Sequence, residues 1–133
     1  MNGLPITSLP VALGRERKLT GIELSSPVPG AASHRLTDDD LANGHAVLVY
    51  PLDLIIRDFH LPQPAVLKVD VDGSEADVIA GAAATLLGVQ HCMIECSAQT
   101  VGSVTAMLGV AGLHGVRRTR RLEPTQWNIE YVR

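Results

Sequence analysis

Residues 67–82 read LKVDVDGSEADVIAGA, and this stretch decides the fold that we expect. It begins inside a nearly continuous apolar run over residues 65–71, which is typical of a parallel strand buried on both faces. Ser74 is a natural helix N-cap, and acids follow it in the first turn, where the helix dipole favours them. Apolar residues then recur at helical spacing as far as Gly88. The stretch therefore predicts a strand, a sharp turn and a helix.

The same alternation continues on both sides of this stretch. Upstream, residues 46–50 predict a strand, and Pro51 precedes a helix with apolar residues at helical spacing. Downstream, residues 91–97 predict a buried strand, residues 100–112 predict a helix, and two strands joined by a turn close the sequence. This order predicts an α/β fold with a mostly parallel sheet, helices on both faces and a C-terminal antiparallel hairpin.

The first third of the sequence is less regular. Two strands are expected, over residues 5–14 and 18–26, and residues 26–45, rich in Pro, Gly, Ser and Asp, predict a loop. The length of 133 residues is that of one domain. We therefore expect a single domain over residues 1–133, in which a strand and loop lead-in ends at residue 45 and a βα core follows.

Composition and charge argue against several classes of protein. The formal net charge is −3 at pH 7, without the basic excess of a general nucleic-acid binder. No basic flank precedes an apolar segment at the start, and no stretch approaches the roughly 20 apolar residues of a membrane span. We expect a cytoplasmic protein without nucleic-acid or membrane partners. Cys92 and Cys96 would lie about 13 Å apart on one strand face, beyond disulfide reach, and are expected to be buried free thiols.

Three acids and a glycine stand at the joint between the central strand and its helix: Asp70, Asp72, Gly73 and Glu75. Ligands of open α/β sheets bind outside the carboxyl ends of the strands, which is where these residues fall. The acids are compatible with a divalent metal site, with a general base for a substrate hydroxyl, or with an acceptor for a ligand amine. The structural alternative is that they cap the turn and that Lys68 pairs with a neighbouring carboxylate.

A basic cluster stands in the predicted C-terminal hairpin. It consists of Arg117, Arg118, Arg120 and Arg121. Such a cluster is usually a solvated face, and the alternative is a binding site for a phosphate or a sugar acid. The sequence leaves both interpretations open.

The quoted stretch resembles the signature of FkbM-type S-adenosylmethionine-dependent methyltransferases, which runs Leu-Lys-Ile-Asp-Val-Glu-Gly-x-Glu before a helix. Asp72 stands where the signature has Glu. The resemblance continues in YPLDLIIRDFHLPQPAVLKVD, which contains Asp53, in CMIECS, which contains Glu95, and in the terminal WNIEYVR. It covers most of the chain and is weakest over residues 14–45 and 98–126.

This resemblance implies a Rossmann-like methyltransferase fold and methyl transfer from S-adenosylmethionine to a hydroxyl oxygen of a small molecule or sugar. At the matching positions, one group of residues would position the acceptor or remove its proton, and another would bind the cofactor. The catalytic candidates are Asp70, Asp72 and Lys68. The candidates for cofactor binding are Asp53, Glu75 and Glu95. No metal site is expected.

The resemblance also implies a glycine-rich cofactor turn between two further strands, and nothing in these 133 residues matches it. NGLPITSLPVALG resembles the third strand of the family, so the sequence looks like an N-terminally truncated family domain. The alternative function is therefore a non-catalytic remnant or interaction module that keeps the scaffold. Because the unmatched strands are central in the family sheet, the strand at residues 65–71 is expected to expose an apolar edge. Residues 11–25 would pair with that edge, or the chain would form a homo-oligomer there.

Overall fold

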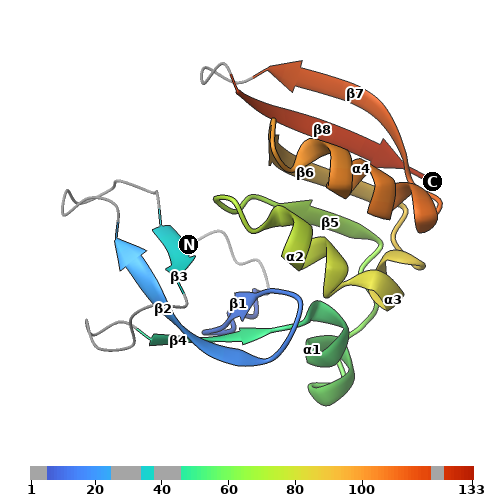
Figure 1. Cartoon of the computed structure of the whole chain (residues 1–133). Helices are drawn as coiled ribbons and strands as arrows, with labels where there is room; N and C mark the ends of the chain where they lie inside the picture. The colour runs from blue at the N-terminus through green and yellow to red at the C-terminus, as the bar shows by residue number, and fades with distance from the viewer. Residues whose placement is uncertain (1–5, 25–33, 38–45, 121–124) are drawn as a thin grey trace.

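The structure, a computed structural model, describes residues 6–24, 34–37, 46–120 and 125–133. Figure 1 shows the strands and helices in this part of the chain. The strands are β1 (Ala12–Leu13), β2 (Lys18–Leu24), β3 (His34–Thr37), β4 (Ala46–Tyr50), β5 (Val66–Val69), β6 (His91–Ser97), β7 (His114–Arg120) and β8 (Gln126–Val132). The helices are α1 (Leu52–Asp58), α2 (Glu75–Ala80), α3 (Ala83–Leu86) and α4 (Val101–Val110). None of these helices is long and apolar enough to cross a membrane.

The strands form two four-stranded sheets instead of the single sheet that the sequence predicted. The first sheet has the order β1-β4-β2-β3, and the second has the order β5-β6-β8-β7. Both are mixed, because β1–β4 and β5–β6 are parallel pairs and the other neighbours are antiparallel. The expected C-terminal hairpin is present as β7 and β8. The α/β class is thus confirmed, whereas one mostly parallel, Rossmann-like sheet is not.

Strand β4 explains why the strands divide between two sheets. Both of its edges are occupied, by β1 on one side and by β2 on the other, so no edge remains for β5. The chain turns at Pro51 into α1, and β5 then pairs with β6, with Val66 opposite His91 and Val69 opposite Ile94. The expectation that residues 11–25 pair with the β5 edge is therefore wrong, since β1 and β2 pair with β4.

Three boundaries also differ from the sequence prediction. The predicted loop over residues 26–45 contains β3, which pairs with β2 and so gains its hydrogen bonds from a partner distant in sequence. The strand expected over residues 5–14 is only the two-residue β1. The helix expected to run as far as Gly88 is divided into α2 and α3, because α2 ends at Gly81.

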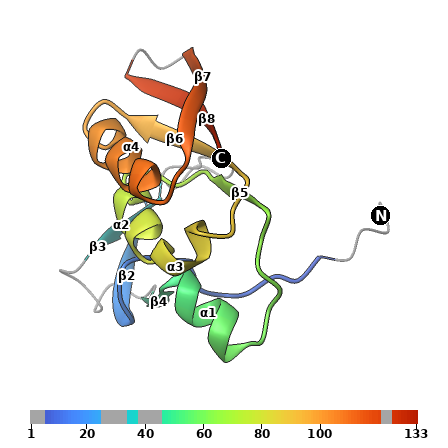
Figure 2. The same cartoon turned by 90° about the vertical axis from the view of Figure 1, so that its right-hand side faces the viewer.

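The second sheet carries the main hydrophobic core on one face. Alternate residues of β6, namely Cys92, Ile94 and Cys96, are fully buried. They pack with Leu108 of α4 and Tyr131 of β8. Helices α2 and α4 contact each other over this face, as Figures 1 and 2 show. The expectation of helices on both faces is not met by these two helices, which share one face.

A close backbone contact between Gly81 and Gly14 joins the end of α2 to the end of β1. A Cβ atom built on Gly81 would lie 2.0 Å from the carbonyl oxygen of Gly14 and 3.2 Å from the Cα of Pro51. The φ of Gly81 is −76°, which any residue can adopt, so the requirement for glycine here is steric. The carbonyl of Gly81 accepts a hydrogen bond from the N–H of Asp53 at 3.0 Å. The end of α2, the start of α1 and the end of β1 therefore meet at one point.

Replacing Gly81 with alanine is expected to destabilise the protein by roughly 2–3 kcal/mol, because the added methyl group forces two backbone segments apart. Gly109→Ala is the matched control. Gly109 lies in α4 with nothing within 4 Å of an added Cβ, so alanine there is expected to stabilise the helix by up to about 1 kcal/mol. Urea denaturation measures both variants, and equal midpoints would show that the Gly81 contact is dispensable.

Candidate functional site

A cleft of about 490 Å³ lies at the carboxyl end of β5. Its polar lining is provided by Lys68, Asp70, Asp72 and Ser74, and residues 11–13 at β1 provide apolar lining. The volume is within the range of small-molecule sites. The structure therefore brings the three predicted catalytic residues to one cleft. Its far wall was not predicted, since nothing local in a two-residue strand indicates contact with a segment so distant in sequence.

Lys68 and Asp70 form an ion pair at this cleft. The Nζ of Lys68 lies 2.6 Å from Oδ2 of Asp70, and both side chains are exposed. Exposed pairs of this kind contribute at most about 1 kcal/mol to stability. The pair therefore contributes little to stability, and its main effect is to fix the position of the Asp70 carboxylate. It also matches the structural alternative in which Lys68 pairs with a neighbouring acid.

Glu75 points into the protein and does not line the cleft. Its side chain is only 3 % exposed, and its Oε1 accepts a hydrogen bond from the N–H of Gly73 at 2.8 Å. Gly73 has φ of 86°, a left-handed conformation that favours glycine, so this bond secures the sharp turn after Asp72. Oε2 of Glu75 is buried and has no hydrogen-bond partner among the described residues, which is uncommon for such an atom. Ser74 occupies the N-cap position as predicted, but its side chain makes no capping hydrogen bond.

Asp53, predicted to bind the cofactor, holds the start of α3. Its Oδ2 accepts a hydrogen bond from the N–H of Ala84 at 2.9 Å. Its Oδ1 accepts from the N–H of Thr85 at 2.8 Å and from the Thr85 hydroxyl at 2.6 Å. Both oxygens thus satisfy donors that are otherwise unpaired at a helix N-terminus. The carboxylate links α1 to α3 and is not part of the cleft lining.

Glu95 and the two cysteines lie on β6, outside the cleft lining. Glu95 is buried and stands opposite Asn128 of β8. Cys92 and Cys96 are free and buried, as predicted. Burial raises the pKa of the Cys92 thiol to about 11, and burial followed by the nearby Glu75 raises the pKa of the Cys96 thiol to about 12. Both thiols are therefore protonated at neutral pH and unsuited to act as nucleophiles.

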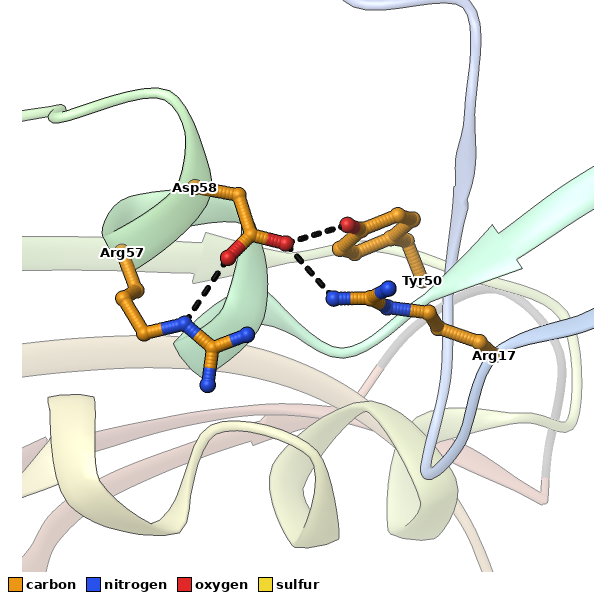
Figure 3. Close-up of polar contacts among 4 residues, drawn as sticks. All are labelled: Arg17, Tyr50, Arg57 and Asp58. Carbon is orange, nitrogen blue, oxygen red and sulfur yellow. Dashed lines mark hydrogen bonds and ion pairs between the residues drawn. The ribbon is translucent and has the colours of Figure 1, made fainter.

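A second polar cluster, centred on Asp58, had no signal in the sequence (Figure 3). Asp58 accepts hydrogen bonds from Tyr50 at 2.5 Å, from Arg17 at 2.6 Å and from Arg57 at 2.8 Å. The Tyr50 hydroxyl and then the Arg57 guanidinium lower the pKa of the Asp58 carboxyl through these bonds. Arg17 also lies over the Tyr50 ring, 4.5 Å from its centroid. Because the Asp58 carboxylate already accepts hydrogen bonds from three side chains of the protein, we interpret this cluster as a structural link between β4 and α1.

The described part of the chain contains no cluster of side chains that would support the alternative of a metal site. No group of three or more His, Cys, Asp or Glu side chains is placed there to hold a metal ion. Asp70 and Asp72 both line the cleft, but the third acid of the joint, Glu75, points away from it into the protein.

The fold and the cleft together define a class: an α/β protein with a carboxylate-lined cleft at the carboxyl end of a parallel strand. Over residues 5–111 the chain matches the Methyltransferase FkbM domain. The chain therefore belongs to the FkbM methyltransferase family, and the resemblance seen in the sequence is confirmed. No curated protein and no solved structure matches the chain.

The family implies S-adenosylmethionine as the methyl donor, and the cleft offers groups that suit it. Carboxylates are the usual protein partners of a cation and accept hydrogen bonds from hydroxyls, such as those of a ribose. Asp70 and Asp72 supply such groups, and Leu13 and Val71 line the same cleft with apolar surface that suits a flat base. The residues that would hold the donor are therefore Asp70 and Asp72.

Removing the Asp53 carboxylate is expected to cost roughly 1–3 kcal/mol of stability, because Asp53→Ala leaves the buried N–H and hydroxyl of Thr85 without a partner. Asp77→Ala is the matched control in the first turn of α2. Asp77 is exposed and paired with Arg15 at 3.1 Å, so its loss is expected to cost under about 1 kcal/mol. Thermal denaturation compares the stability of the two variants. Similar losses of stability would argue against a stabilising role of the Asp53 hydrogen bonds to α3.

Proposed function

We propose that this protein transfers a methyl group from S-adenosylmethionine to a hydroxyl oxygen of a small molecule or sugar. The family match over residues 5–111 is the observation that carries the proposal. The cleft at the end of β5 supports it, because three candidate side chains from the strand and the following turn converge on a volume suited to a small ligand.

Besides contacting the donor, Asp70 and Asp72 are proposed to act on the acceptor at the same cleft. When bound, the cofactor supplies an electrophilic methyl group. A carboxylate at the cleft orients the acceptor hydroxyl and takes its proton as the oxygen gains the methyl group. Lys68 is proposed to keep the Asp70 carboxylate in place through their 2.6 Å ion pair.

The predicted cofactor residues are proposed to act mainly by positioning. Both oxygens of Asp53 are engaged by α3, and Oε1 of Glu75 is engaged by Gly73, so direct contact with a ligand would require these bonds to break. Glu75 shapes the turn that presents Asp72, and Asp53 fixes the helix behind it. Glu95 is buried on the neighbouring strand β6, and it is likewise proposed to have a positioning role.

Calorimetric titration of S-adenosylmethionine into the folded chain tests the proposal. We expect a micromolar dissociation constant for the wild-type protein and a loss of about tenfold or more in Asp70→Asn or Asp72→Asn, since each removes a charge-assisted contact. Asp77→Asn, an exposed acid on α2 outside the cleft lining, is the matched control and is expected to bind normally.

Two results would contradict the proposal in different ways. Absence of binding to a well-folded chain would favour the alternative function, a non-catalytic interaction module built on the same scaffold. Normal binding with full turnover in Asp70→Asn would remove Asp70 as the base and leave Asp72 as the candidate.

We also propose that the open edge of β5 pairs with a second copy of this chain. Among the described strands β5 pairs only with β6, and its Val66 is 66 % exposed. A short apolar strand with unpaired backbone groups is a template for edge-to-edge association.

Sedimentation velocity at increasing protein concentration tests this association. A dimer is expected for the wild-type chain and a shift towards monomer for Val66→Lys, because a charge on an edge strand opposes pairing. Val110→Lys, which alters an apolar side chain 90 % exposed on α4, is the control expected to leave the dimer intact. A wild-type chain that stays monomeric at every concentration would refute the proposal.

A further inference from the structure

A second pocket, of about 320 Å³, lies between α4 and the β7–β8 hairpin. Gly115 is one of its lining residues, and the register of β7 against β8 shifts between Gly115 and Arg117. A Cβ added to Gly115 would point at the Tyr131 ring, 3.4 Å from its nearest atom. The absent side chain and the irregular register therefore leave room between the strand and the helix.

The charged wall of this pocket is formed by Arg118, which stands opposite Ile129 of β8. The guanidinium of Arg118 lies over the Trp127 ring, 4.0 Å from its centroid. Stacking holds the planar guanidinium through its face, so its N–H groups at the edge are available to an oxyanion. Among the described residues no carboxylate lies within ion-pair distance of Arg118. The side chain of the preceding Arg117 lies on the other face of the hairpin, where it pairs with Glu130 at 3.6 Å.

The rest of the pocket is apolar with one pair of hydroxyls. Ile129 and Tyr131 contribute from β8, and Thr105 of α4 shares a hydrogen bond of 2.7 Å with the Tyr131 hydroxyl. Val101, the first residue of the ten-residue helix α4, also lines the pocket, so the positive end of the helix dipole lies there. The Arg118 guanidinium and a helix N-terminus give this pocket a positive potential, whereas the β5 cleft is lined by Asp70 and Asp72.

We infer that this pocket binds a small molecule that carries a phosphate or carboxylate group. The oxyanion lies against the edge of the Arg118 guanidinium. The apolar body of the ligand lies on Ile129 and Tyr131. The inference uses none of the residues of the β5 cleft, and it holds whether or not the chain transfers methyl groups.

The single tryptophan of the chain makes the test direct. The indole N–H of Trp127 gives one peak in a proton–nitrogen correlation spectrum of the full chain, beneath the stacked Arg118. Phenyl phosphate, benzoate and phenol are titrated separately at constant ionic strength, since they share a ring and differ in the group attached to it. We expect a saturable shift of the Trp127 peak with phenyl phosphate or benzoate, and the tighter of the two identifies the preferred oxyanion.

Variants link any binding to this pocket. Arg118→Gln is expected to weaken binding at least tenfold, and Arg57→Gln, which alters an exposed arginine on α1, is expected to leave it unchanged. Gly115→Val fills the pocket without altering charge and is also expected to abolish the shift, so the test does not depend on one variant folding.

Three outcomes would overturn the inference. The first is a shift with phenol equal to that with the two anions, which would mean that the apolar surface alone binds. The second is a shift that never saturates as phenyl phosphate or benzoate is added. The third is binding that survives both Arg118→Gln and Gly115→Val.

Discussion

The close approach of Gly81 to the carbonyl of Gly14 is the constraint on which the arrangement of this protein depends. It allows the backbone that follows β1 and the backbone at the end of α2 to meet with no side chain between them. Hydrogen bonding from Asp53 to Gly81, and the Asp53 carboxylate on the start of α3, then fix α1 and both short helices at the same place. Helices of four to seven residues are not stable by themselves. This tertiary contact therefore provides stability that such short helices lack on their own.

The candidate site follows from this contact. Residues 11–13 immediately precede Gly14, so the contact places them against the carboxyl end of β5 as one wall of the cleft. Lys68, Asp70 and Asp72 form the other wall, and the buried Glu75 holds the turn that follows. The acids that are accessible to a ligand are thus separated from the acids that maintain the backbone around them.

The second sheet carries a cleft lined by acids and a pocket with an arginine wall, and charges near both affect the buried Cys96. Burial is the main cause of the raised pKa of Cys96; Glu75 raises it further, whereas Arg118 opposes the change. Both charges therefore act on the same end of β6. The acidic cleft suits a cation or a hydroxyl donor, and the basic pocket beside α4 suits an anion, so one sheet offers two complementary kinds of binding surface.

The sequence by itself determined the local elements and the position of the acidic turn. Alternating apolar patterns gave most strands and helices from residue 46 onward, and the order Asp-Val-Asp-Gly-Ser-Glu placed acids at a strand end because strand, turn and helix are all local signals. Only the tertiary structure decided that both edges of β4 are paired and that a predicted helix ends at Gly81. It also decided that Glu75 and Asp53 accept hydrogen bonds from backbone N–H groups and do not line the cleft. These outcomes depend on contacts between segments far apart in the chain, and no local pattern of residues records which partner a strand edge or a carboxylate will find.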